Sequence, residues 1–95
     1  MESDEFEWDD DKAAKNLANH SVSFETATRV FDDAFAVEWQ DERARHDEDR
    51  FIILAMVDER VLSVVYTLRN GRTRIISARG AEPWEKRKYH EENTR

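Results

Sequence analysis

Arginines in the C-terminal half of the chain are the residues whose type and spacing best suit the binding of a polyanion. A guanidinium presents a planar fork of donors that matches a phosphate group. Asn70-Gly71 lies between two β-branched runs, and this dipeptide strongly favours a two-residue hairpin because both turn residues need positive φ. The sequence therefore predicts a cationic hairpin over residues 61–79, whose arginines are Arg69, Arg72, Arg74 and Arg79.

The predicted turn fixes which residues lie opposite each other. The expected pairs are Arg69 with Arg72, Thr67 with Arg74, Tyr66 with Ile75 and Val64 with Ser77. Side chains alternate along a strand, so one face is expected to be core and the other a cationic surface. The core face would hold Leu62, Val64, Tyr66, Leu68 and Ile75, and the cationic face Ser63, Thr67, Arg69, Arg72 and Arg74. Arg79 is expected about 20 Å from the turn, at roughly 3.3 Å per residue.

A second set of candidate residues recurs at every fourth position upstream of the hairpin. Lys12, Asn16 and His20 would form one stripe along a short helix predicted over residues 12–19. The preceding aspartates, Asp9 to Asp11, suit its N-cap and first turn. Two interpretations are open for the stripe. It is either a solvated polar face, or the border of a phosphate-binding groove.

A charge-dense segment, residues 40–50, precedes the most apolar run of the chain. A solvated loop is the usual interpretation of such a segment. The apolar run, residues 51–57, predicts a central strand covered on both faces. Glu48 and Arg50 stand at the entrance to this strand, where a carboxylate and a guanidinium are well placed for chemistry.

The remaining elements must position these side chains. We expect a short strand over residues 6–8, a second helix from the N-cap Ser23 to about residue 32, an edge strand over 35–39 and a final helix over 82–92. The predicted order is β-α-α-β-β-β-β-α, in one α+β domain spanning residues 1–95. The sheet is expected to be mostly antiparallel, with two N-terminal helices and one C-terminal helix.

Charge is divided unevenly along the 95 residues. The net charge of −7 taken alone argues against a nucleic-acid partner. Residues 1–60, however, hold 7 Lys and Arg against 18 Asp and Glu, whereas residues 61–95 hold 8 against 4. The C-terminal third is therefore basic.

The absence of cysteine excludes disulfides and thiolate metal sites, and no apolar run approaches the roughly 18 residues of a membrane span. A cytoplasmic protein without a cofactor or metal is expected.

Motifs spread over nearly the whole chain resemble one protein family. Val65-Tyr66-Thr67-x-Arg69 and the run from Arg74 to Arg79 are the most specific, and His20, Val22-Ser23-Phe24-Glu25, Glu48-Asp49-Arg50-Phe51, Glu85, Arg87 and Tyr89 accompany them. On these residues the chain resembles BrnT, the ribonuclease toxin of the BrnT/BrnA type II toxin-antitoxin system. It departs from the family at Asn19-His20-Ser21, where Lys-His-Gly is usual, and at Ala55, where Gly is frequent.

The resemblance implies a RelE-like fold, metal-independent cleavage of RNA that inhibits translation, and a BrnA-like antitoxin that contacts DNA itself. Cleavage without a metal needs a base, an acid and cations near the phosphate. His20 is the candidate acid or base, Glu48 its carboxylate partner, and Arg69 and Arg79 the holders of the scissile phosphate. Further RNA contacts are expected from Lys12, Arg72, Arg74, Arg87 and Lys88. The alternative is a catalytically degenerate toxin-like module that only docks a partner protein.

Overall fold

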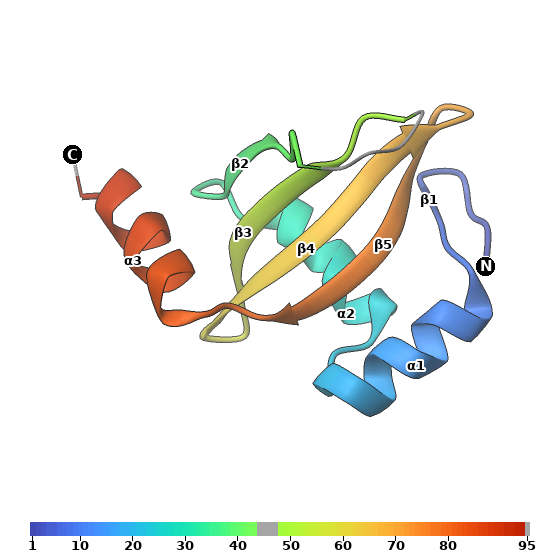
Figure 1. The fold of residues 1–95 in the computed structure, drawn as a ribbon, viewed down its shortest axis with the longest axis horizontal. Coiled ribbons are helices and arrows are strands. Elements are labelled where there is room, and N and C mark those ends of the chain that lie inside the picture. The colour runs from blue at the N-terminus through green and yellow to red at the C-terminus, as the bar shows by residue number, and fades with distance from the viewer. Residues whose placement is uncertain (44–47, 95) are drawn as a thin grey trace.

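A mixed five-stranded sheet in the order β1-β5-β4-β3-β2 forms the body of the protein (Figure 1). The computed structural model describes residues 1–43 and 48–94. His46, one of the three histidines of the sequence and part of the charge-dense segment, lies outside the described residues. β1 pairs with β5 in parallel and all other neighbours are antiparallel. The elements are β1 (Phe6–Glu7), α1 (Asp10–His20), α2 (Phe24–Ala27), the 3₁₀ helix η1 (Thr28–Asp32), β2 (Val37–Gln40), β3 (Phe51–Val57), β4 (Arg60–Arg69), β5 (Arg72–Gly80) and α3 (Pro83–Glu92). The predicted α+β class is confirmed.

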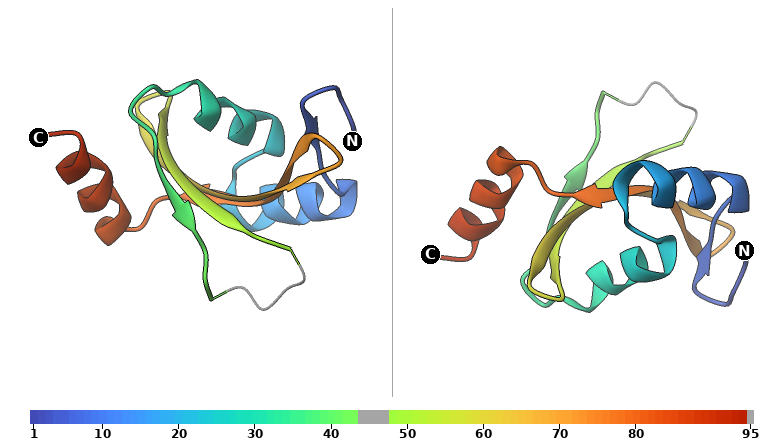
Figure 2. Two further views of the ribbon diagram at one scale, coloured as in Figure 1. Left: turned by 90° about the horizontal axis from the view of Figure 1, so that it is seen from above. Right: turned by 90° about the horizontal axis from the view of Figure 1, so that it is seen from below.

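The two faces of the sheet differ in what covers them. α2 and η1 pack on one face, α1 lies beside β5, and α3 stands off at one end (Figure 2). The main core fills the space under α2 and η1, and its largest fully buried members include Phe24, Leu62 and Val64. The opposite face is called here the open face. Among residues 1–43 and 48–94, a core cluster covers it at one end, where Tyr89 of α3 packs on Leu54.

The β4–β5 hairpin follows the prediction near its turn and departs from it further along. Asn70 and Gly71 both have positive φ, 54° and 75°, as a two-residue primed turn requires. Arg69 pairs with Arg72, Thr67 with Arg74 and Tyr66 with Ile75, as predicted. Leu68, predicted in the core, is 65% exposed because it lies next to the turn, beyond the reach of the helices.

A β-bulge separates the two halves of this hairpin. Val65 pairs with Ser77 and Val64 with Ala78, so the predicted pair of Val64 with Ser77 is wrong. The extra residue in β5 is Ile76, and it reverses the alternation beyond it. Without the bulge Arg79 would lie opposite Leu62 on the core face; with it, Arg79 lies opposite Ser63 on the open face.

Two other predictions need correction. The second helix is only four residues long before it tightens into η1, in a stretch of β-branched residues where the Thr28 hydroxyl donates to the carbonyl oxygen of Glu25 at 2.7 Å. The edge strand begins at Val37, because the carboxylate of Asp33 accepts from the amide of Phe35 and turns the chain there. The prediction of an interior, buried strand over residues 51–57 is confirmed, because β3 lies between β4 and β2 and most of its residues are buried.

No helix in the described part of the chain is both long and apolar enough to cross a membrane.

Candidate functional site

A buried amide fixes α1 against the sheet and so decides where its C-terminal end lies. The Asn16 side chain donates to the carbonyl oxygens of Val22 and Ala78 at 2.9 and 2.7 Å, and accepts from the amide of Ala78 at 3.1 Å. Asn16 therefore satisfies backbone groups on the edge of β5 away from β4, beyond Arg74, where the pairing with β1 ends. The predicted stripe of Lys12, Asn16 and His20 is therefore neither a purely solvated face nor a purely ligand-binding one. Its middle residue, Asn16, anchors α1 to the sheet, and this anchor brings His20 to the end of β5.

His20 lines an open depression of about 410 Å³ at this end of the sheet, called here the His20 depression. Its wall is formed by Asn19, His20, Arg60, Val61, Arg79, Gly80, Ala81, Glu82 and Lys86. α1 ends beside it at Ser21, which adopts the left-handed conformation, φ 58°. Four groups that can carry positive charge meet a single carboxylate here, so the depression is suited to an anion.

The absence of a side chain at Gly80 makes room for one of these cations. A Cβ atom built on Gly80 would lie 2.6 Å from a terminal nitrogen of Arg60, closer than real contacts allow. Arg60 is the first residue of β4 and follows the tight β3–β4 turn, where Asp58 and Glu59 both have positive φ, 50° and 67°. A backbone position without a Cβ thus lets a guanidinium lie against β5, next to Arg79.

Arg79 forms a two-pronged ion pair with a carboxylate that is almost inaccessible. Its terminal nitrogens lie 2.7 and 3.2 Å from the two carboxylate oxygens of Glu85, which is 2% exposed. Glu85 also accepts from the Ser63 hydroxyl and the Glu82 amide, at 3.1 and 2.8 Å. Desolvation acts to raise the pKa of Glu85, but the hydrogen bonds from Arg79 and Glu82 outweigh it and hold the pKa below its usual value. The pair orients Arg79 and ties α3 to the sheet.

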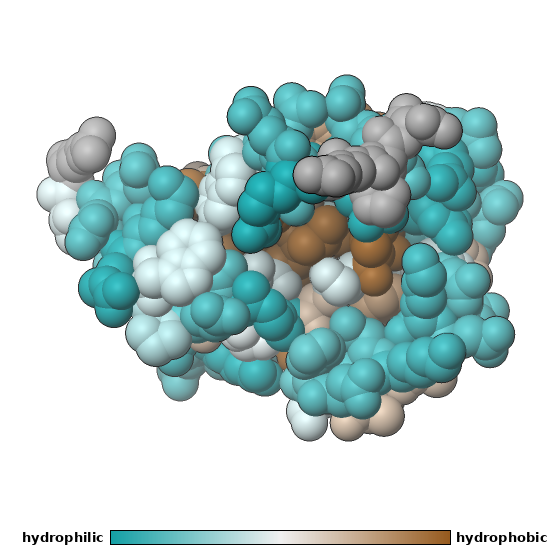
Figure 3. Space-filling view, in the orientation of Figure 1, coloured by the Kyte–Doolittle hydropathy of each residue, from teal (hydrophilic) through white to brown (hydrophobic). Residues whose placement is uncertain are grey.

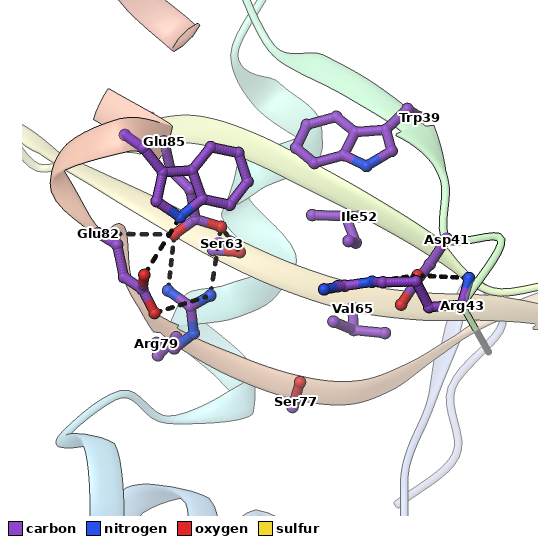
Figure 4. Close-up of a pocket in the computed structure, with 11 residues that line it drawn as sticks. Trp39, Asp41, Arg43, Ile52, Ser63, Val65, Ser77, Arg79, Glu82 and Glu85 are labelled. Carbon is purple, nitrogen blue, oxygen red and sulfur yellow. Dashed lines mark hydrogen bonds and ion pairs between the residues drawn. The ribbon is translucent and has the colours of Figure 1, made fainter. Parts of the chain in front are cut away.

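A second cavity, the tryptophan pocket, adjoins the first on the open face and shares Arg79 and Glu82 with it. Figure 3 shows an apolar floor in the middle of this face, surrounded by hydrophilic residues. The pocket holds about 280 Å³ and is lined by Trp39, Asp41, Arg43, Ile52, Ser63, Val65, Ser77, Arg79, Glu82, Trp84 and Glu85 (Figure 4). The ring centroids of Trp39 and Trp84 are 6.5 Å apart, with 54° between the ring planes.

The turn end of the hairpin has a different character, because each of its arginines is neutralised. Arg69 pairs with Glu48 at 3.1 Å, Arg72 with Glu2 at 3.2 Å and Arg74 with Glu7 at 3.2 Å. Desolvation acts to raise the pKa of Glu48, but the Thr67 hydroxyl and the neighbouring Arg69 and Arg50 lower it below its usual value. Glu48 is therefore held ionised as a partner for arginine.

The structure divides the predicted catalytic residues into two pairs. His20 and Arg79 line one depression, and Arg69 contacts Glu48 near the turn. Arg79 lies opposite Ser63, six residues along β4 from Arg69, or about 20 Å at roughly 3.3 Å per residue. One phosphate cannot contact both pairs. Of the other predicted RNA contacts, Lys12 and Arg87 are exposed, and the Lys88 ammonium lies 5.2 Å from the Trp39 ring centre.

Several residues of the two cavities were not predicted from the sequence, among them Arg60, Lys86, Trp39 and Trp84. Arg60 pairs with Val57 across the Asp58-Glu59 turn, and its place near Gly80 follows from the β4–β5 pairing, in which Leu62 lies opposite Gly80. For the two tryptophans no local signal exists, since they meet only when α3 packs near β2. Within the described residues, no group of three or more His, Asp or Glu side chains could hold a metal ion.

Residues 8–85 match the model of a family of ribonuclease toxins from type II toxin-antitoxin systems. The match includes α1, β2 to β5 and the beginning of α3, and therefore every lining residue of the two cavities except Lys86. The chain belongs to this family, BrnT, as its sequence motifs had predicted. A comparison with curated proteins finds no match for this chain.

Proposed function

We propose that the protein is a metal-independent endoribonuclease, and that the His20 depression is where it cleaves RNA. The observation that carries this proposal is the meeting of His20 with Arg79, Arg60 and Lys86 in one solvent-open depression. An imidazole is the side chain whose unperturbed pKa lies nearest neutrality, and guanidiniums stabilise the charge that develops on a phosphorane. Membership of a ribonuclease toxin family supports the same conclusion.

The reaction begins with attack of the ribose 2′-oxygen on the adjacent phosphorus and expels the 5′-oxygen of the next nucleotide. The products are a 2′,3′-cyclic phosphate and a 5′-hydroxyl. One group must accept the 2′-hydroxyl proton and another must protonate the leaving oxygen. His20 and Glu82 are the acid-base side chains that line the depression, so Glu82 takes the partner role expected for Glu48. We assign the base to Glu82 and the acid to protonated His20.

The remaining predicted contacts are proposed to act on nucleotides that flank the scissile phosphate. Lys12, Arg87 and Lys88 are carried by α1 and α3, the two helices that flank the open face (Figure 1). Arg69, Arg72 and Arg74 lie at the turn end and would contact RNA only by exchanging their carboxylate partners for phosphates. Their contribution is therefore expected to be smaller than that of Arg79.

Further properties follow from the proposal and from membership of the family. A BrnA-like antitoxin would neutralise the protein and would itself carry the DNA contact. Cleavage of cellular RNA in the cytoplasm would inhibit translation and arrest growth. We also propose that the arrangement of sheet and helices is RelE-like.

One observation favours a second candidate function, a degenerate toxin that only binds its antitoxin. All four predicted arginines of the hairpin already have carboxylate partners, including Arg79. In addition, Asn19 lines the depression at a position where the family usually has lysine. Each ion pair must be broken or shared before a phosphate can bind, and this weakens the affinity for RNA.

The two candidates are separated by digestion of a defined RNA with the purified protein and with the His20→Ala variant. We expect His20→Ala to cleave at least about 100-fold more slowly, because a positioned acid or base contributes 10² to 10⁴ in rate. His90→Ala is the matched control, since His90 is an exposed histidine of α3 outside both cavities. EDTA should leave the rate unchanged, and the products should end in 2′,3′-cyclic phosphate. Equal cleavage by the two variants would contradict the assignment, and no cleavage by the wild-type protein would favour the degenerate toxin.

A further inference from the structure

The tryptophan pocket is a cavity of the open face to which the proposed cleavage chemistry assigns no task. Trp8 is buried in the core at 6% exposure, whereas Trp84 at the start of α3 is 46% exposed. Trp84 lines one cavity together with Trp39, so the two indoles offer aromatic ring surface that a flat ligand would bury. We propose that the tryptophan pocket binds one unpaired nucleobase of the RNA, next to the phosphate held in the His20 depression; this inference rests on the proposed function.

The size and shape of the pocket suit a single flat ring system. Its volume of about 280 Å³ falls just below the range of roughly 300 to 1,000 Å³ that accommodates drug-sized ligands. Apolar side chains, Ile52 and Val65, form the floor, and the indole of Trp39 stands above them in Figure 4. The 54° angle between the two indoles rules out a sandwich between parallel rings, so the base would stack on one of them. Every base has an aromatic face, and stacking of this kind tolerates sequence variation.

The charges around the two cavities distinguish a base from a phosphate. The tryptophan pocket is lined by two cations and three carboxylates, and the Lys88 ammonium beside Trp39 balances this excess. The His20 depression, by contrast, combines Arg60, Arg79 and Lys86 with one carboxylate. A neutral heterocycle therefore fits the first cavity and an anion the second. A nucleotide presents these two groups side by side, a neutral base and an anionic phosphate.

Arg79 fixes the spatial relation between the two cavities. It lines both, and its ion pair with Glu85 holds it at their boundary. A phosphate contacting Arg79 therefore has a base-sized cavity directly beside it. The hydroxyls of Ser63 and Ser77 lie in the same pocket and provide donors and acceptors for the edge of a base.

The experiment measures binding without cleavage. The probe is a fluorescein-labelled RNA tetranucleotide with 2′-O-methyl groups, which cannot attack its own phosphate, titrated with the full chain and followed by anisotropy. We expect Trp84→Ala to weaken binding about 5- to 100-fold, the value of one stacked base. Trp84→Phe should keep most of the affinity because it retains a ring. Phe35→Ala is the matched control, because Phe35 is a 64% exposed aromatic residue outside the pocket.

Removal of single bases tests whether the tryptophan contacts a base or only shapes the surface. Four tetranucleotides, each abasic at one position, are titrated with the wild-type protein and with Trp84→Ala. We expect one of them to bind both proteins equally, because the lost base is the one that stacks on Trp84. An equal effect of Trp84→Ala on all four would overturn the inference. So would unchanged RNA binding by Trp84→Ala together with lost binding of an antitoxin, which would make the pocket a protein-binding site.

These outcomes are independent of the proposed reaction. The methylated probe reports base binding even if the protein cleaves nothing, in which case the proposed function fails and the base site stands. Conversely, the protein could cleave RNA in a His20-dependent manner while Trp84→Ala binds the probe with unchanged affinity. This result would support the proposed nuclease and contradict the proposed base site.

Discussion

The two ends of the β4–β5 hairpin carry the same residue type in different electrostatic settings. At the turn end, three arginines each face a carboxylate supplied by the N-terminal segment, by β1 or by Glu48. At the other end, Arg79 is paired with a buried carboxylate, but Arg60 and Lys86 form no ion pair with any described residue. Only the second end keeps an excess of positive charge.

This difference shows that the net charge of a sequence segment does not predict the local charge on the surface of the folded protein. The basic character of residues 61–95 suggested one continuous cationic ribbon. Folding, however, brings β1 alongside β5 and places Glu7 against Arg74. The acidic N-terminal region thus neutralises the near half of the ribbon and leaves the excess of positive charge at the far end.

The largest expected effect is on catalysis, at Arg79. We expect Arg79→Ala to cleave RNA about 100- to 1,000-fold more slowly, as is usual when one oriented donor to a developing oxyanion is lost. Arg72→Ala, at the turn end, should cleave within a few-fold of the wild type. Rates are compared on one defined RNA under single-turnover conditions. Equal losses at both ends would abolish the distinction drawn between them.

A folding control must accompany Arg79→Ala, because this change leaves Glu85 buried without its partner. Arg79→Lys keeps the positive charge and removes the two-pronged geometry. If Arg79→Lys is as stable as the wild type yet cleaves slowly, the guanidinium fork itself is required. Recovery of the full rate with lysine would reduce the role of Arg79 to its charge.

The second prediction concerns the free energy of unfolding. It compares the ion pair of Arg79 with the buried Glu85 and the ion pair of Arg72 with the exposed Glu2. Removal of one partner of a buried pair typically costs about 3 to 5 kcal/mol, whereas an exposed pair contributes about 0 to 1 kcal/mol. Because Glu85 is 2% exposed but Arg79 is 36% exposed, we expect Arg79→Ala to lower the free energy of unfolding by about 2 to 3 kcal/mol and Arg72→Ala by less than about 1 kcal/mol. Urea titration followed by circular dichroism measures both. Similar losses would show that the two ends are held equally.

The pH dependence of stability gives the sign of the Glu85 contribution. The folded state lowers the pKa of Glu85 below its unfolded value, which is near 4.5. Its ionised form therefore stabilises the fold above about pH 4.5, and this contribution is lost as the pH falls through the lower folded pKa. Glu85→Gln removes this titration. The stability difference between wild type and Glu85→Gln should consequently shrink on acidification, and a difference that grows would reverse the sign.

Sequence reasoning succeeded where local rules decide the structure. Asn70-Gly71 fixed the turn and the first three cross-strand pairs, because positive φ at both positions has few sequence solutions. The aspartates before α1 gave its N-cap, where Asp9 accepts from the amides of Asp11 and Lys12. The sequence hypothesis grouped His20 with Glu48, Arg69 and Arg79, and the structure brings His20 and Arg79 to one depression although they are far apart in the sequence.

The failures of sequence reasoning lie where distant segments meet. The bulge at Ile76 has no local signature, yet it decides which face Arg79 occupies. Ion pairs such as Arg72 with Glu2 join residues that no spacing rule connects. The same holds for the pocket between Trp39 and Trp84, which depends on where α3 packs. In each case the tertiary arrangement, and not residue type, determined the role of the side chain.

The last prediction concerns Asn16, the anchor that brings His20 to the cationic end of the hairpin. Asn16→Ala leaves the buried amide and carbonyl of Ala78 without side-chain partners, and we expect this to lower the free energy of unfolding by about 2 kcal/mol. Lys12→Ala is the matched control, one turn away on the same stripe but exposed, and should cost less than about 0.5 kcal/mol.

Cleavage should also fall in Asn16→Ala under conditions where the variant remains folded, because α1 loses its link to β5 and His20 is no longer held beside Arg79. Lys12→Ala should keep its stability and lose only modest affinity for RNA. Full activity of folded Asn16→Ala would mean that His20 reaches its position without the anchor, and that α1 is placed by its contacts with α2 instead. A loss of activity equal to that of His20→Ala would show that positioning by Asn16 is as important as the imidazole itself.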